Sequence, residues 1–131
     1  MLSRTRGAYL RMVPMLLCMG TIFFLSQQPA GALDVDLFPA QDKVAHLLLY
    51  GLLSATVLFG FSPQIRYNNK TLAATTAFLV SVLFGVLDEY HQSFIAGRTP
   101  ELLDVAADGA GALLVSTLWL LRGSAAGCGE G

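Results

Sequence analysis

Four apolar runs divide this chain, and each is long enough to cross the hydrocarbon core of a membrane as a helix. An α-helix rises about 1.5 Å per residue, so about 20 residues span a core of about 30 Å. Only 13% of the 131 residues are charged, whereas about 25% are charged in an average soluble domain. We therefore predict an all-α polytopic membrane protein, a four-helix bundle that forms a single domain over residues 1–125, followed by a disordered tail over 126–131. The expected helices cover about residues 8–26, 44–61, 72–92 and 100–121.

The first run has two interpretations. Arg4, Arg6 and Arg11 precede or begin it, and the small residues Ala30 and Ala32 follow it. A basic segment, an apolar segment and a small-residue site in this order are typical of a cleaved signal peptide. The run is also long enough to be a retained transmembrane helix, with the Arg11 side chain reaching back to the interface. We favour the retained helix; cleavage would leave three spans.

The distribution of basic residues predicts the orientation of the chain in the membrane. With four spans, the N-terminus, the connection 64–70 and the C-terminus share one side, and six of the eight Lys and Arg residues lie there. Cytoplasmic segments carry an excess of basic residues, so both termini are expected in the cytoplasm. Lys43, Arg98 and most of the acidic residues then lie near the outer face. The six residues on the cytoplasmic side are Arg4, Arg6, Arg11, Arg66, Lys70 and Arg122.

Three of the expected helices carry a row of polar side chains near the outer face. Residues three or four positions apart share one face of a helix. An ionisable group that faced lipid would cost about 3 kcal/mol, so the three rows are expected to face one another. The rows consist of Asp42, His46 and Tyr50; of Asp88, His91 and Gln92; and of Asp104 and Asp108.

Asp108 is the residue of these rows for which a purely structural role is hardest to justify, because it lies more than a turn inside an apolar helix. The residues around it, 106–112, are otherwise all Ala or Gly. Such residues let helix backbones approach closely, which is expected to bring Asp108 near His46 or Asp88. Glu89 lies one residue off the Asp88 face and is expected to face water.

Two positions match the signals of a helix start. Asp42 has the side chain to cap the second helix, as an alternative to a role in a site. Thr99 precedes Pro100, the pattern of an N-cap residue followed by Pro at the first helical position. The fourth helix is therefore predicted to begin at Pro100, with Thr99 as its N-cap residue.

The carboxylates near the outer face outnumber the cationic side chains, so we expect protons, water or a cation among them. His46 and His91 can exchange protons, ligate a metal or act as neutral hydrogen-bond partners. An Asp-x-x-His pair with a second His and Asp suffices chemically for zinc or manganese, but the spacing matches no strong signature, and no metal or other cofactor is assigned. Arg98 is either a site residue or an interfacial anchor. The candidate binding residues are Asp42, Lys43, His46, Tyr50, Asp88, Glu89, His91, Gln92, Arg98, Asp104 and Asp108, and the candidate catalytic residues are His46, His91, Asp88 and Asp108.

Several short motifs follow one another in a characteristic order. They are Ser26-Gln27-Gln28-Pro29, Asp42-Lys43-Val44-Ala45-His46 with Tyr50-Gly51, Asp88-Glu89-Tyr90-His91-Gln92-Ser93-Phe94, Gly97-Arg98, and Asp104-Val105-Ala106-Ala107-Asp108 with Gly111. In this order they resemble the VanZ-like family, small bacterial membrane proteins named for an accessory factor in teicoplanin resistance. The resemblance implies four helices, a retained first helix and a multi-pass location in the bacterial plasma membrane. It also implies a link to the cell envelope and to glycopeptide tolerance, but no mechanism; members often carry Asn at the position of Asp108.

Two classes of function fit these features. The first is an accessory envelope protein whose outward-facing cleft binds a membrane lipid, a lipid-linked wall precursor or another envelope protein, with an effect on teicoplanin susceptibility. The second is a small membrane enzyme acting on a lipid-linked substrate, with His46 or His91 as general acid or base, oriented by Asp42 or Asp88, or with a metal. An ion path is disfavoured because the inner half of each run is nearly free of charge. Nucleic acid is not expected as a partner, because the Lys and Arg residues form no stripe beside aromatic residues.

Overall fold

The computed structural model describes residues 2–32 and 37–125, and these residues form helices and connections without any strand. The helices are α1 (Leu2–Ser26), α2 (Gln41–Gly60), α3 (Pro63–Asn68), α4 (Lys70–Gln92) and α5 (Leu102–Ala125). By length and composition, α1, α2, α4 and α5 are each able to cross a membrane. The predicted all-α architecture is therefore confirmed for the described residues, with four helices long and apolar enough to span a membrane. The predicted disordered tail, 126–131, lies outside the described residues.

Several helix ends differ from the predicted bounds, and the largest difference is at α1, which begins at Leu2 and not at about residue 8. The second helix begins at Gln41, after Ala40, whose φ of 64° is left-handed, so Asp42 lies in the first turn and is not the N-cap residue. The short helix α3 occupies the predicted turn; Pro63 is at its start, and the Ser62 hydroxyl accepts a hydrogen bond from the backbone N–H of Ile65. The last long helix begins at Leu102, so the predicted start, with Thr99 as N-cap and Pro100 as the first helical residue, is wrong.

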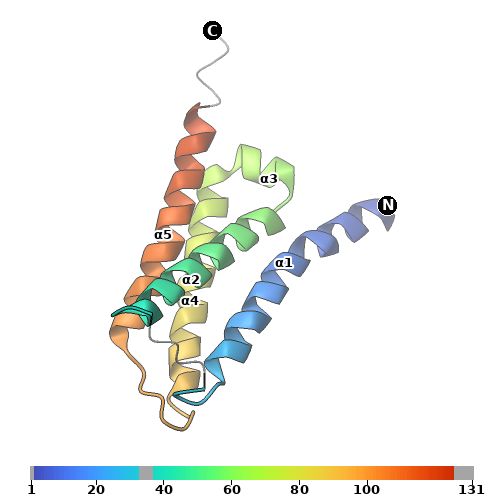
Figure 1. Ribbon diagram of the computed structural model, residues 1–131. Helices are drawn as coiled ribbons and strands as arrows, with labels where there is room; N and C mark the ends of the chain where they lie inside the picture. Colours follow the sequence, from blue (N-terminus) through green and yellow to red (C-terminus); the bar gives the residue numbers. More distant parts are fainter. Residues whose placement is uncertain (1, 33–36, 126–131) are drawn as a thin grey trace.

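The second helix is the centre of the bundle, since it packs against α1, α4 and α5 (Figure 1). Its closest neighbour is α5, and the two backbones meet at Gly51 and Gly111. A Cβ atom added to Gly111 would collide with the backbone carbonyl of Leu47, so only glycine permits this approach. Below the crossing, the hydroxyls of Ser54 and Ser116 share a hydrogen bond of 3.0 Å.

The outer surface of the bundle is apolar. Large hydrophobic side chains are exposed on all four long helices, for example Leu17, Leu52, Leu83 and Leu118. The small core lies between α1, α2 and α4 and includes Ile22, Leu53 and Ala77. Exposed Leu residues of this kind fit a helix surface that contacts lipid, which is consistent with the spanning lengths.

The bundle has two distinct ends (Figure 1). The beginning of α1, the short α3 and the end of α5 lie at one end, and the ends of α1 and α4 lie at the other. The first helix leans away from the other long helices toward its own beginning. The polar residues singled out in the sequence belong to the end where α2 and α5 begin and where α4 finishes.

Candidate functional site

The centre of the site is a pair formed by His46 of α2 and Asp108 of α5. The imidazole Nδ1–H donates to Asp108 Oδ1 at 2.8 Å. Asp108 is 0% exposed, and its other oxygen, Oδ2, has no hydrogen-bond partner among the described residues. Gly85 of α4 makes room for this carboxylate, because a Cβ atom added there would lie 2.5 Å from Oδ2. The prediction that small residues bring Asp108 close to His46 is confirmed.

A second cluster surrounds the ammonium group of Lys43, one turn before His46 on α2. Lys43 Nζ lies 2.7 Å from Asp42 Oδ2. It lies at the same distance from Asp104 Oδ1 and also pairs with the carboxylate of Glu101. One cation therefore bridges three acids and joins the beginnings of α2 and α5.

Glu89 of α4 is buried, with 5% of its surface exposed, so the expectation that it faces water is wrong. Its Oε2 accepts a hydrogen bond of 3.0 Å from the backbone N–H of Glu101. The chain that enters α5 passes over this side of α4, a contact that the periodicity of α4 alone does not reveal. The same carboxylate satisfies one of the N–H groups that any helix start leaves without a helical partner. Glu89 Oε1 has no hydrogen-bond partner among the described residues.

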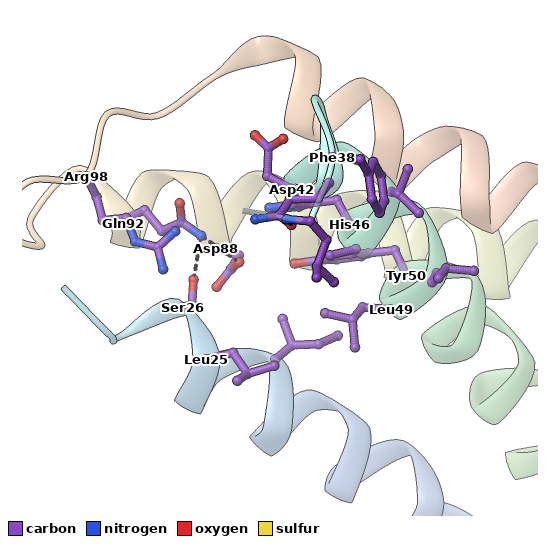
Figure 2. Close-up of a pocket in the computed structure, with 16 residues that line it drawn as sticks. Leu25, Ser26, Phe38, Asp42, His46, Leu49, Tyr50, Asp88, Gln92 and Arg98 are labelled. Carbon is purple, nitrogen blue, oxygen red and sulfur yellow. Dashed lines mark hydrogen bonds between the residues drawn. The ribbon is translucent and has the colours of Figure 1, made fainter. Parts of the chain in front are cut away.

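A pocket of about 460 Å³ adjoins this polar centre, between α1, α2, α4 and the segment that leads into α2 (Figure 2). Its lining is divided by polarity. One part is apolar, and the other carries hydrogen-bonding and charged groups. His46 lines the pocket on one side and contacts Asp108 on the other. The apolar lining includes Ile22, Leu25, Val44, Leu48 and Leu49, and the polar lining includes Ser26, Asp42, Asp88, Gln92 and Arg98.

Two buried residues form the floor of the polar part. Tyr50, 1% exposed, lies with its ring parallel to that of His46, with the ring centroids 6.1 Å apart. Asp88 is also buried and accepts a hydrogen bond of 3.4 Å from the amide of Gln92. The same amide donates to the Ser26 hydroxyl at 2.7 Å, so this bond links α4 to the end of α1 (Figure 2).

The two remaining candidates lie further from the centre. His91 packs against Phe23 of α1, with ring centroids 5.0 Å apart, and it does not line the pocket. The structure thus does not bring His91 to His46 and Asp108 as expected, because α1 covers the face of α4 that carries it. Arg98 lines the pocket, and its Nε donates to the backbone carbonyl of Gln28 at 3.1 Å.

Three residues of the site were missed in the sequence. Ser26 holds Gln92, and its signal was available as the first of three polar residues directly after an apolar run. Glu101 pairs with Lys43, but its position next to Pro100 suggested only an acid in the first turn of a helix. Gly85 makes room for the Asp108 carboxylate and carries no signal, because a glycine in an apolar helix usually reflects packing alone.

The geometry limits the chemistry available to His46. Its Nδ1 is held by Asp108, so the expectation that Asp42 or Asp88 orients this ring is wrong. Its Nε2 lies 3.9 Å from Asp104 Oδ2. A general base needs a nitrogen within hydrogen-bond reach of the proton it removes. Nδ1 is therefore occupied, and Nε2 is the nitrogen left for proton exchange or for a ligand.

Within residues 2–32 and 37–125, two groups of side chains have the spacing that a metal ion requires. In each, one donor atom from every member lies within 4.8 Å of the others. Neither group contains Asp88 or His91, the pair suggested by the sequence. The groups are His46, Glu89 and Asp104, and Asp42, Glu101 and Asp104.

The fold and the site together define a class: small helical membrane proteins whose titratable side chains gather between the helices at one end of the bundle. A family model described as VanZ/LLP1 matches residues 12–123, which cover α2 and α4 completely and most of α1 and α5. The chain therefore belongs to the VanZ-like family, as the motifs had indicated. Comparison with curated proteins and with solved structures gave no match.

Proposed function

We propose that this protein is an accessory component of the bacterial cell envelope that binds the head group of an amphiphile, either a membrane lipid or a lipid-linked wall precursor. The observation that carries the proposal is the divided pocket, in which apolar side chains of α1 and α2 lie beside Arg98, Gln92 and buried Asp88. An amphiphile has the same division, with a hydrocarbon chain next to a polar head. Ligand pockets usually combine an apolar lining with a few polar groups that fix orientation.

The charges in the pocket favour a head group that contains phosphate and amine. The guanidinium of Arg98 is suited to a phosphate, because it presents several N–H donors in a planar fork. The carboxylates of Asp42 and Asp88 are suited to an amine. The excess of basic residues at the opposite end of the bundle supports an outward-facing pocket, in the plasma membrane and on the side where wall precursors are used.

Binding can be measured on the purified full-length chain in nanodiscs. Phosphatidylethanolamine and a lipid-linked wall precursor are offered separately, and retention is quantified by native mass spectrometry. We expect Arg98→Gln to weaken retention of the preferred lipid about tenfold, the loss of one charge-assisted contact. Arg122→Gln removes a basic residue from the other end of the bundle and serves as the matched control. Equal retention by both variants would refute the proposal.

The link to glycopeptides is tested in cells. A strain that lacks the protein is complemented with the wild type, with Arg98→Gln or with Arg122→Gln, and its teicoplanin susceptibility is measured. We expect Arg98→Gln to behave like the deletion and Arg122→Gln like the wild type. If Arg98→Gln complements fully although it no longer retains lipid, the bound amphiphile has no part in the phenotype.

A second candidate function is acid–base catalysis on a lipid-linked substrate, and the pair of His46 with buried Asp108 is the observation that favours it. A His held by a carboxylate is a common arrangement for proton transfer. Incubation of the purified protein with a lipid-linked precursor distinguishes the two functions. A product of changed mass that disappears in His46→Gln establishes an enzyme, whereas binding without any change in mass supports the accessory role.

A further inference from the structure

We infer that His46, Glu89 and Asp104 form a binding site for one divalent transition-metal ion of the zinc or manganese class. The inference is independent of whether the pocket binds an amphiphile. It starts from geometry: a nitrogen of His46 and one carboxylate oxygen each from Glu89 and Asp104 lie within 4.8 Å of one another. Donors about 2.0–2.2 Å from a shared ion lie within such distances, and an imidazole with two carboxylates is a donor set that both metals accept.

The buried donor of Glu89 is the second observation. Its Oε2 is used by the backbone N–H of Glu101, but Oε1 is buried and has no hydrogen-bond partner among the described residues. A buried charged oxygen without a partner costs at least about 1–3 kcal/mol, so native proteins rarely leave one. A metal ion held with His46 and Asp104 would satisfy it.

The charge balance of the described residues points the same way. Four carboxylates are buried at this end of the bundle, and the cationic partners placed against them are the ammonium of Lys43 and the imidazole of His46. With the neutral imidazole that binds a metal, the negative charges exceed the single positive charge of Lys43 by three. Uncompensated charge away from water is strongly unfavourable, and a divalent ion would reduce this excess to one. The four buried acids are Asp88, Glu89, Asp104 and Asp108.

The second group with suitable spacing provides a contrast. Asp42, Glu101 and Asp104 surround Lys43 Nζ, which pairs with all three. That group already holds a cation and is partly exposed. In the group with Glu89, the Lys43 ammonium pairs only with Asp104, through Oδ1, and Glu89 forms no ion pair among the described residues. This group is therefore the one better suited to a metal.

Asp108 completes the arrangement as a positioning residue. It accepts the hydrogen bond from His46 Nδ1, which leaves Nε2, 3.9 Å from Asp104 Oδ2, as the nitrogen available to a metal. Metal-binding histidines usually donate their other N–H to a carboxylate in this way, and the bond fixes the ring orientation. Three protein ligands also leave a coordination position open for water or an anionic oxygen.

Metal content is the first test. The full-length protein, purified in detergent with any histidine tag removed, is stripped with a chelator, incubated with Zn²⁺ or Mn²⁺ and separated from free ion by gel filtration. Elemental analysis is expected to find one ion per chain for at least one of the two metals. No retained ion after incubation with about 100 μM of either metal would overturn the inference.

Variants then identify the ligands. Glu89→Gln and Asp104→Asn are expected to weaken metal affinity at least tenfold, since each removes a charged donor. Asp42→Asn, in the group around Lys43, is the matched control and is expected to retain the metal. Loss of metal in Asp42→Asn with retention in Glu89→Gln would place the ion elsewhere and refute the site.

A spectroscopic measurement decides the matter even if an acidic variant does not fold. The chain contains two histidines, and only His46 belongs to the proposed site. Pulsed electron paramagnetic resonance of the Mn²⁺-loaded protein is expected to show coupling to an imidazole nitrogen that is lost in His46→Gln and kept in His91→Gln. Absence of nitrogen coupling in the wild type would show that the manganese lies outside this site.

Discussion

Asp108 is the residue on which the polar centre depends, because its carboxylate joins α5 to His46 and also fills the space beside Gly85. It is wholly buried in a helix otherwise composed of apolar and small residues around this point. The shape of this side chain matters as much as its charge. The amide of an Asn side chain has nearly the same shape and can still accept a hydrogen bond from the N–H of His46. The methyl group of an Ala side chain neither fills the space nor accepts the bond.

Replacement of Asp108 by Ala or by Asn separates these two properties. We expect Asp108→Ala to lower the free energy of unfolding by about 3 kcal/mol, since it removes one member of a buried pair and leaves a cavity. Asp108→Asn is expected to lose less than half of that. Thermal unfolding in detergent can be followed by the fluorescence of Trp119, which packs against the core. Equal destabilisation by the two variants would show that the charge, and not the shape, is essential.

Gly85 and Gly109 offer a matched comparison. A Cβ atom at Gly85 would lie 2.5 Å from Asp108 Oδ2, whereas one at Gly109 meets only Val82 Cγ2 at 3.8 Å. Gly85→Ala is therefore expected to displace the carboxylate and to destabilise the protein by about 1–3 kcal/mol, as overpacking does. Gly109→Ala is expected to be neutral or slightly stabilising. The same unfolding assay measures both, and a neutral Gly85→Ala would mean that Asp108 does not need its observed position.

Single residues show where sequence reasoning succeeds at this site and where it fails. Asp108 was recognised because a carboxylate inside an apolar run has few explanations, and its small neighbours indicated a close helix. Glu89 was misjudged because its partner is a backbone N–H from another segment, which no periodicity within α4 predicts. His91 was misplaced for a related reason: the face of α4 that meets α1 depends on how far α1 leans, and the sequence does not encode that angle locally.

At the scale of the elements, the contact between α2 and α5 holds the site together. His46 and Asp108 come from these two helices, and their backbones meet at Gly51 and Gly111 one turn further along. The pair can form only because the backbones are so close. The stability of the crossing and the geometry of the site are therefore coupled through a single glycine contact.

Gly111→Ala is expected to push α2 and α5 apart, because the new Cβ atom would collide with a backbone carbonyl that cannot rotate away. We expect a loss of about 2–3 kcal/mol in the free energy of unfolding. Gly20→Ala, where no atom lies within 4 Å of the added Cβ, is the control and is expected to raise stability slightly. The inference of a metal site gains a check here, since Gly111→Ala is also expected to reduce metal retention. An unaltered unfolding temperature would contradict the tight crossing.

The helices themselves were largely predictable, because an apolar run of spanning length has few alternatives in lipid. Their ends were not. The start of α5 was placed at Thr99 from its similarity to a capping pattern, but the backbone N–H of Glu101 is satisfied by the side chain of Glu89 instead. The short α3 was taken as a turn, although Ser62 followed by Pro63 is a sufficient start signal for one or two helical turns.

At the scale of the whole molecule, orientation in the membrane is the outstanding prediction. In a background of Cys18→Ser and Cys128→Ser, we expect a cysteine at Ala96 to react with a membrane-impermeant thiol reagent applied to intact cells. A cysteine at Asn69 is expected to react only after the cytoplasmic side is opened, because basic residues mark that connection as cytoplasmic. Both positions are exposed on the folded protein. Labelling of Asn69→Cys from outside would reverse the topology and place the pocket on the cytoplasmic side.

The pocket is bordered by side chains that also lie on the surface of the bundle. Leu48 lines the pocket and is 64% exposed, and Val44, one turn earlier on α2, also lines the pocket and is exposed on the surface. The wall on this side is therefore not closed by protein, and what adjoins it in a bilayer is acyl chain. The amphiphile proposed as ligand would reach such a site by lateral diffusion within its own leaflet. Its occupancy would then follow its mole fraction among the surrounding lipids, and water-soluble fragments of the same head group would compete poorly.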